Sequence, residues 1–232
     1  MTAYVGIDAC SAGWFASILE DGEFETTRYQ TFDDVWEVHS SADRILVDIP
    51  IGLPEEGTRT CDTDARALLG CRGVSVFDTI CRPLLALEDY ETANERYREL
   101  AGKGLTKQAW YLREKIEQVD AVVRNDERTI DVIYESHPEL CFYSLNDRNP
   151  VAYSKSSDRG RSKRLGLLSE SFEHAEPMYE NAEVEYLRKN VARDDILDSM
   201  VLAVAARSDL VSLPTDGTDR DPWMKIWYPK PE

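Results

Sequence analysis

The first 48 residues constrain the fold most, because they contain four strand-like segments joined by short connections. These segments are residues 4–8, 14–19, 24–29 and 44–48. Asp21-Gly22 is a strong hairpin signal between the second and third segments. Thr31 can cap a short helix before the fourth, which is a continuous apolar run typical of a buried parallel strand. The order predicts an antiparallel meander followed by a crossover, and hence an α/β fold.

The rest of the chain is expected to be mainly helical, with one further strand of the same sheet at residues 129–134. We expect helices at 62–69, 88–100, 106–123, 161–172, 177–190 and 194–210, and a short strand at 224–228. Residues 55–128 are too long for a simple crossover and are interpreted as a helical insert within a single domain, 1–232. The simplest packing gives a five-stranded mixed sheet. Its first strand is central, beside the strand at 45–48 and then the strand at 130–134.

Three of the predicted parallel strands end in a carboxylate. These residues are Asp8, Asp48 and Glu135. The carboxyl ends of parallel strands meet at one edge of an open sheet, which is where α/β proteins place their sites. An acid that merely begins a turn remains an alternative for each residue.

A fourth source of carboxylates is the helix that begins near Asp194. Asp195 and Asp198 lie about 60° apart on one face of it, at the usual 100° per residue. Asp195 has the simpler alternative of favouring the helix dipole in the first turn. Asp198 is followed by seven residues that are apolar all around the helix, so it needs a cation or a hydrogen-bond donor.

Clustered carboxylates repel one another unless they are protonated or bridged by a metal ion. Oxygen ligands suit Mg²⁺ or Mn²⁺, and two such ions, on the order of 4 Å apart, can activate water against a phosphodiester. His137 follows the third acid and is expected to orient water, bind metal or contact phosphate, or else to form a structural hydrogen bond.

Composition limits the partners and the compartment. The chain has 44 acidic and 27 basic residues, a formal net charge of -17 and a pI near 4.6. This argues against a general nucleic-acid coat or an anionic-membrane binder, and suggests adaptation to high salt. The N-terminus has no secretion signal, no apolar run is long enough to span a bilayer, and the five cysteines form no CxxC pair. We therefore expect a cytoplasmic protein without a membrane partner, with reduced and mostly buried thiols.

The residues that carry a family resemblance run through nearly the whole chain. They are Gly6-Ile7-Asp8, Gly13-Trp14, Asp48-Ile49-Pro50-Ile51-Gly52-Leu53-Pro54, Arg59, Cys61-Asp62, Ala65-Arg66, Leu69-Gly70, Ser75-Val76-Phe77, Lys107-Gln108-Ala109-Trp110, His137-Pro138-Glu139, Lys155 and Asp194-Asp195-Ile196-Leu197-Asp198. As a set they resemble the family called domain of unknown function 429, regarded as predicted RNase H-like nucleases.

The wider resemblance is to the RuvC-like branch of the RNase H fold. It implies that Asp8, Asp48, Asp195 and Asp198 hold Mg²⁺ or Mn²⁺, with Asp8 and Asp198 sharing metal and Glu135 extra to the pattern. The function expected is a metal-dependent nuclease or phosphodiesterase with a nucleic acid or a phosphorylated small ligand as its partner. A non-catalytic binding or regulatory module and an actin-like ATPase or phosphotransferase remain alternatives.

Several basic and polar residues outside the acidic set are candidates for substrate binding. They are Arg59, Asp62, Arg66, Ser75, Lys107, Gln108 and Lys155. Arg59, Asp62 and Arg66 are expected either to clamp a phosphate or to form a salt-bridge network that anchors the insert. Lys155 begins the one strongly basic segment, residues 155–164, which is expected either to hold a phosphate backbone or to be a solvated loop.

Overall fold

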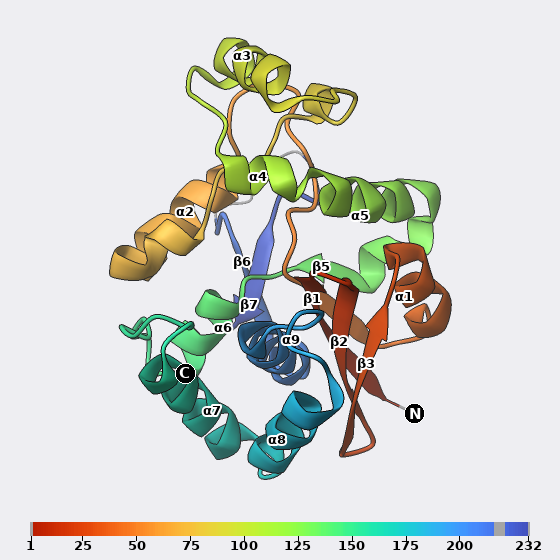
Figure 1. Cartoon of the computed structure of the whole chain (residues 1–232), viewed down its shortest axis with the longest axis vertical. Helices are drawn as coiled ribbons and strands as arrows, with labels where there is room; N and C mark the ends of the chain where they lie inside the picture. Colours follow the sequence, from red (N-terminus) through yellow and green to blue (C-terminus); the bar gives the residue numbers. More distant parts are fainter. Residues whose placement is uncertain (1, 216–220, 232) are drawn as a thin grey trace.

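The computed structural model describes residues 2–215 and 221–231 (Figure 1). Its strands are β1 (Ala3–Cys10), β2 (Gly13–Glu20), β3 (Glu23–Tyr29), β4 (Arg44–Val47), β5 (Ile133–Glu135), β6 (Leu210–Leu213) and β7 (Ile226–Pro229). Its α-helices are α1 (Phe32–His39), α2 (Thr60–Leu69), α3 (Tyr90–Ala101), α4 (Lys107–Tyr111), α5 (Arg113–Asn125), α6 (Pro138–Leu145), α7 (Asp158–Ser171), α8 (Ala175–Glu185) and α9 (Arg193–Ala206). Short 3₁₀ helices occupy Gly70–Ser75, Arg82–Leu84 and Glu127–Asp131.

The main sheet has five strands in the order β3-β2-β1-β4-β5. The β1–β2 and β2–β3 pairs are antiparallel, whereas β1–β4 and β4–β5 are parallel. This confirms the expected five-stranded mixed sheet with β1 at its centre. Asp21 and Gly22 both have positive φ angles, as the predicted hairpin turn between β2 and β3 requires.

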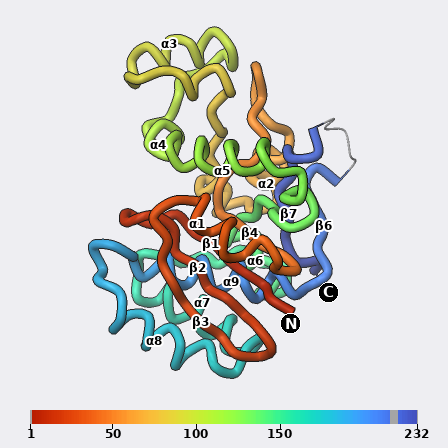
Figure 2. The backbone as a smooth tube through the Cα atoms, turned by 90° about the vertical axis from the view of Figure 1, so that its right-hand side faces the viewer, coloured from red at the N-terminus to blue at the C-terminus, as the bar shows by residue number. Residues whose placement is uncertain are grey.

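Helices cover both faces of the sheet (Figure 2), and an apolar core lies on each face. Alternate strand residues such as Val5, Ile7 and Val47 pack with α1 and α5 on one face. Leu46 and Phe15 point the other way and pack with α6, α7, α8 and α9. Helix α9 is buried on every side from Ile196 onward, as the apolar run at residues 200–206 predicts.

Gly6 sets how closely α9 approaches β1. A Cβ atom added there would lie 2.1 Å from the Ser199 carbonyl oxygen and 2.3 Å from the Ala203 amide nitrogen. Ser199 also meets Ser17 of β2 through a buried hydroxyl–hydroxyl hydrogen bond of 2.8 Å. The small residue therefore lets the helix backbone rest directly on the centre of the sheet, with Asp198 next to the contact.

The predicted strand at 129–134 is wrong in its first half. Residues Glu127–Asp131 form a 3₁₀ helix, and the strand itself is Ile133–Glu135, so Glu135 is inside the strand rather than after it. The Asp126 side chain accepts the Arg128 amide at 3.0 Å, and the Thr129 hydroxyl donates to the Asp126 carbonyl at 2.6 Å. These local side-chain hydrogen bonds favour a turn over the β-propensity of the segment.

Other element boundaries also differ from the predictions. The helix expected at 106–123 is divided at Leu112 into α4 and α5, although the Leu112 carbonyl still accepts the Ile116 amide at 2.9 Å. Helix α9 ends at Ala206, and β6 then pairs with β7 in a second, two-stranded sheet that the sequence pattern did not reveal. Helix α6 was also missed, although Pro138 at its first turn is a recognised helix-start signal.

The cysteines agree with expectation. None of the five, all within the described residues, is in a disulfide; Cys71 is exposed and the others are buried. Among the described helices, none combines the length and apolar character needed to cross a bilayer.

The contact between β1 and α9 generates a stability prediction. Replacing Gly6 with Ala should lower the free energy of unfolding by at least about 3 kcal/mol, because the new methyl group would overlap backbone atoms of α9. Gly166→Ala in α7 is the matched control. Its Cβ would meet nothing within 4 Å, and the better helix former should stabilise the protein by about 1 kcal/mol. Urea unfolding of both variants checks this; equal stability of Gly6→Ala and the wild type would contradict it.

Candidate functional site

Strand register brings the first two acids together. The Asp48 amide, just after β4, donates to the Ile7 carbonyl of β1 at 2.9 Å, so Asp48 lies beside Asp8. Ile7 and its partner Val47 point into the α1/α5 core. Because side chains alternate along a strand, the position of Asp8 faces α9, as does Gly6 two residues before it.

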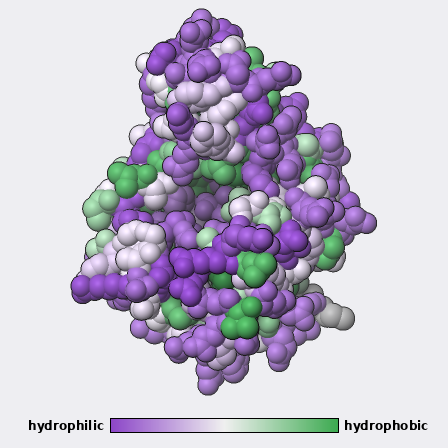
Figure 3. Space-filling model, viewed as in Figure 1, coloured by the Kyte–Doolittle hydropathy of each residue, from purple (hydrophilic) through white to green (hydrophobic). Residues whose placement is uncertain are grey.

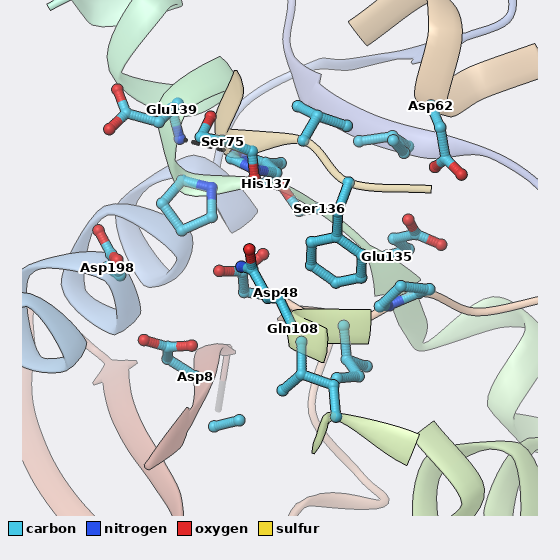
Figure 4. Close-up of a pocket in the computed structure, with 18 of the residues that line it drawn as sticks. Asp8, Asp48, Asp62, Ser75, Gln108, Glu135, Ser136, His137, Glu139 and Asp198 are labelled. Atoms are coloured by element: carbon cyan, nitrogen blue, oxygen red, sulfur yellow. Dashed lines mark hydrogen bonds between the residues drawn. The ribbon is translucent and has the colours of Figure 1, made fainter. Parts of the chain in front are cut away.

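Helix α9 supplies the third acid. Asp198 is 1% exposed and Asp8 7%, while Asp48 is half-buried. One carboxylate oxygen from each of these three residues lies within 4.8 Å of the other two. Figure 4 shows the three side chains around one space, below His137 and Ser75. We call Asp8, Asp48 and Asp198 the carboxylate triad.

Burial and mutual repulsion both act on the triad. Burial raises the pKa of Asp8 well above its usual value, and the charges of Asp48 and Asp198 raise it further. Burial is also the main cause of the raised pKa values of Asp48 and Asp198, and the Lys155 ammonium opposes the shift of Asp198. Full ionisation of the triad therefore needs positive charge close by.

The donor set fits a hard divalent cation. Mg²⁺ binds oxygen at about 2.1 Å, which places its ligand oxygens at most about 4.2 Å apart. The 4.8 Å limit within the triad differs from this by about half an ångström, a displacement that small side-chain rotations can supply. Carboxylate oxygens without sulfur or imidazole favour Mg²⁺ or Mn²⁺ over Zn²⁺.

The triad opens into a cavity of about 270 Å³. Its walls come from the carboxyl ends of the parallel strands, from α4, and from the 3₁₀ segment that follows α2. The residues that line it include Asp8, Asp48, Pro50, Arg59, Asp62, Ser75, Phe77, Gln108, Leu112, Glu135, His137, Glu139, Lys155 and Asp198. Figure 3 shows a hollow on this face, below the helices at the top of the view, within a mostly hydrophilic surface.

Glu135 lines the same cavity but faces away from the triad. In the parallel register Glu135 pairs with Val47, so the next residue, Ser136, is the neighbour of Asp48. The Glu135 carboxylate is 5% exposed and accepts the Ile51 amide at 2.6 Å and both Arg59 terminal nitrogens at 2.6 and 2.7 Å. Burial nevertheless raises the pKa of Glu135 to about 7, against the opposing effect of Arg59.

Arg59 and Asp62 form a buried salt-bridge network. This is the second of the two arrangements expected for them, in place of a phosphate clamp. Arg59 is 2% exposed and lies between Glu135 and Asp62, whose Oδ1 is 2.5 Å from the Arg59 Nη2. This network joins the start of α2 to the sheet. Arg66 lies outside the cavity lining and pairs with Asp78 at 2.7 Å.

Asp195 lies near the triad but is not one of the carboxylates that converge within 4.8 Å. Its Oδ2 accepts the Ala192 amide at 2.8 Å, which satisfies a backbone donor at the helix N-terminus. Burial raises the pKa of Asp195 to about 7, although the Ala192 hydrogen bond opposes the shift. Asp195, which the family resemblance places among the metal ligands, therefore caps the N-terminus of α9.

Of the other predicted residues, some line the cavity and some lie outside it. His137 lines the cavity; its Nδ1 accepts the Glu139 amide at 3.2 Å and its Nε2 is 3.4 Å from the Ser75 carbonyl, so both ring nitrogens have protein partners. Gln108 is exposed at the cavity wall. Lys107 lies outside the lining, with its ammonium 5.9 Å from the centre of the Tyr90 ring.

Lys155 reaches the triad. Its Nζ is 2.6 Å from the Asp198 Oδ2 and 3.8 Å from the Asp194 Oδ2. The other bases of segment 155–164 include two with internal partners. Arg164 is completely buried and pairs with Glu139 at 2.5 Å, and Arg161 donates to the Ser156 carbonyl at 2.7 Å.

Glu139 is the site residue that sequence reasoning passed over. It is 4% exposed, its Oε1 accepts from Arg164 and from Arg72, and its Oε2 is buried without a hydrogen-bond partner in the structure. Its place two residues after His137, in the first turn of α6, could have signalled a helix-start acid. The two arginines that hold it could not have been identified from spacing.

Comparison with known proteins gives a family and no activity. The sequence model of the family described as "Protein of unknown function (DUF429)" matches residues 6–218. No curated protein and no solved structure matches the chain.

The raised pKa values predict how stability depends on pH in metal-free protein. A carboxyl whose pKa is higher in the folded than in the unfolded chain contributes full stability below pH 3.8, the usual Asp value, and loses it as pH rises toward the folded pKa. Asp8→Asn should therefore match the wild type near pH 4 and be more stable near pH 7, by about 1.4 kcal/mol per unit of pKa elevation. Unfolding in chelator across this range measures the difference, and a less stable variant at pH 7 would contradict the prediction.

The buried network gives a second prediction. Arg59→Met should destabilise the fold by about 3–5 kcal/mol, because Asp62 and Glu135 would remain buried without their cation. Arg96→Met removes an exposed pair with Glu99 and should change stability by less than about 1 kcal/mol. Thermal or denaturant unfolding compares them, and similar effects of the two substitutions would argue against the network.

Proposed function

We propose that this chain, which belongs to the DUF429 family, is a metal-dependent hydrolase of phosphodiester bonds. The observation that carries the proposal is the carboxylate triad, Asp8, Asp48 and Asp198, at the carboxyl ends of two parallel strands and beside a cavity. Three buried acids of raised pKa are costly to the fold, and a bound cation would offset that cost.

The proposed reaction is hydrolysis by water. The triad would hold Mg²⁺ or Mn²⁺, which when bound activates water and stabilises the leaving oxygen. The oxygen of water bonds to phosphorus and the ester P–O bond breaks. The attacking water gives up one proton, and the leaving oxygen takes one up through the surrounding water. The triad would set the position of the ion, and residues 75–77 form the cavity wall beside it. His137, held at both ring nitrogens, orients this wall.

We further infer that the fold is RNase H-like, in its RuvC-like branch. Support comes from the strand order, with an antiparallel meander followed by two parallel strands, and from a last long helix that brings Asp198 to β1 and β4. In this comparison Asp8 and Asp48 take the strand-end positions and Asp198 takes the helix position.

A small phosphodiester is the substrate class we favour over a long nucleic acid. The cavity of about 270 Å³ is close to the lower end of small-molecule sites, roughly 300–1,000 Å³. Arg161, Arg164 and Lys155 have internal partners, which leaves little of segment 155–164 to follow a phosphate backbone. The net charge of -17 acts in the same direction.

Activity assays with Mg²⁺ or Mn²⁺ in high salt test the proposal. The substrates are bis(4-nitrophenyl) phosphate, DNA, RNA and hybrid duplexes. Asp8→Asn and Asp198→Asn should each lower the rate by more than about a hundredfold, because even outer-shell changes at metal sites have effects of about 10–100-fold. Asp33→Asn, an exposed acid in α1, is the control and should keep full activity.

Two outcomes would overturn the assignment. Hydrolysis that survives both triad substitutions would place the reaction elsewhere. Binding of Mn²⁺ at the triad with no hydrolysis of any of these substrates would favour the non-catalytic binding module.

A further inference from the structure

We propose that the Lys155 ammonium occupies the place of a second metal ion, so that the triad binds one divalent cation and works as a one-metal, one-lysine centre. The inference rests on the metal site of the proposed function. It concerns a residue whose segment the sequence indicated only as a phosphate-binding patch or a solvated loop.

The number of carboxylates that converge at the triad limits how many ions it can hold. A two-metal site built as the sequence predicted needs Asp195 beside the triad. In the structure the Asp195 Oδ2 accepts the Ala192 amide at 2.8 Å, and Asp195 is not among the carboxylates that converge within 4.8 Å. Among residues 2–215 and 221–231, the carboxylates that converge closely enough to share an ion are Asp8, Asp48 and Asp198, which suffice for one cation.

The charges at the triad also favour a single divalent ion. Lys155 already lies within the cluster, with its Nζ 2.6 Å from the Asp198 Oδ2. A lysine side chain is ordinarily an ammonium at neutral pH, so it brings one positive charge to the cluster. One divalent ion and one ammonium balance the three carboxylate charges. A second divalent ion would leave an excess of positive charge over these three carboxylates. The acids near enough to reduce it are the partly exposed Asp194, 3.8 Å from the lysine, Asp195, and Glu139, which already pairs with Arg164 and Arg72.

The loop that carries Lys155 is held by arginines of α7. The completely buried Arg164 donates to the Tyr153 carbonyl at 3.1 Å, and Arg161 donates to the Ser156 carbonyl at 2.7 Å. These contacts fix the backbone on both sides of Lys155. Segment 155–164 therefore holds the Lys155 ammonium in place. Arg161 and Arg164 donate hydrogen bonds to the loop and are not free to bind a ligand through those groups.

Gly160 also helps to hold the loop that carries Lys155. A Cβ at Gly160 would lie 1.9 Å from the Ser154 carbonyl oxygen, so only glycine lets the loop close against the first turn of α7. The Ser157 hydroxyl donates to the same carbonyl at 2.7 Å and accepts the Gly160 amide at 3.1 Å. A loop held this firmly suits a cation that must keep its place when substrate arrives.

With one ion on the triad, Lys155 supplies the second positive charge on the cavity wall. An ammonium beside Asp198 can contact a phosphate oxygen that an ion opposite it also holds. Loss of the lysine should then weaken phosphate binding and strengthen metal binding. A lysine with a purely structural role would alter neither of them specifically.

The experiment is a Mn²⁺ titration of chelator-treated, full-length protein in high salt, followed by calorimetry and by the spin-resonance signal of free Mn²⁺. The wild type should bind one Mn²⁺ per chain. Lys155→Met should bind Mn²⁺ at least about tenfold more tightly, because removing a positive charge a few ångströms from a divalent ion has about this effect even at the dielectric constant of water. Lys155→Arg, which keeps the charge, should resemble the wild type.

Lys103→Met is the matched control. Lys103 is 43% exposed and pairs with Asp78 at 2.5 Å, whereas Lys155 is 41% exposed, so both substitutions break a half-exposed lysine–aspartate pair. Mn²⁺ affinity should not change in the control. Lys155→Gln replaces Lys155→Met if the latter does not fold.

The outcomes separate this inference from the proposed function. Two Mn²⁺ ions in the wild type, or equal affinity in the wild type and Lys155→Met, would overturn the one-metal, one-lysine centre while leaving a metal-dependent hydrolase in place. One Mn²⁺ and tighter binding by Lys155→Met, without hydrolysis of any phosphodiester, would support the centre and refute the hydrolase. A wild type that binds no Mn²⁺ would refute both.

Discussion

The burial of three carboxylates beside an apolar helix is the constraint on which the candidate site depends. Asp8, Asp48 and Asp198 are brought together by strand register and by the close packing of α9 on β1. Each loses hydration there, and burial is the largest cause of the raised pKa in all three. In its fully ionised form such an arrangement needs compensating positive charge, so the same packing that forms the core also creates a demand for cations.

The negative charge of buried acids is balanced in two different ways in this protein. On the far side of the cavity, Glu135 and Asp62 are neutralised by the buried Arg59, and this network joins α2 to the sheet. At the triad, only the half-exposed Lys155 approaches, from a loop held by α7. The first cluster is internally balanced and structural. The second has more negative charge than its lysine can balance, which is why we assign the metal to it.

The fold could be predicted from the sequence where local pattern and tertiary packing agree. The hairpin at Asp21-Gly22, the apolar strand β4 and the apolar run of α9 all have strong local signals, and the order of the five-stranded sheet followed from them. Prediction failed where side chains made local hydrogen bonds, as at Asp126 and Thr129, because these favoured a turn in a segment of high β-propensity. Strand β6 is as short as β4, but Ser212 interrupts its apolar run, so its pattern is less clear.

The sequence by itself determined that acids lie at the carboxyl ends of β1 and β4 and that Asp198 lies on a buried helix, because these facts depend on periodicity along single elements. It also implied membership of the family that the match over residues 6–218 establishes. Only the tertiary structure decided which acids share a site. One residue of register turned Glu135 to the opposite face of the sheet, and one backbone hydrogen bond kept Asp195 at its helix end. The partners of Arg59, Glu139 and Lys155 come from distant parts of the chain, so no local pattern could specify them.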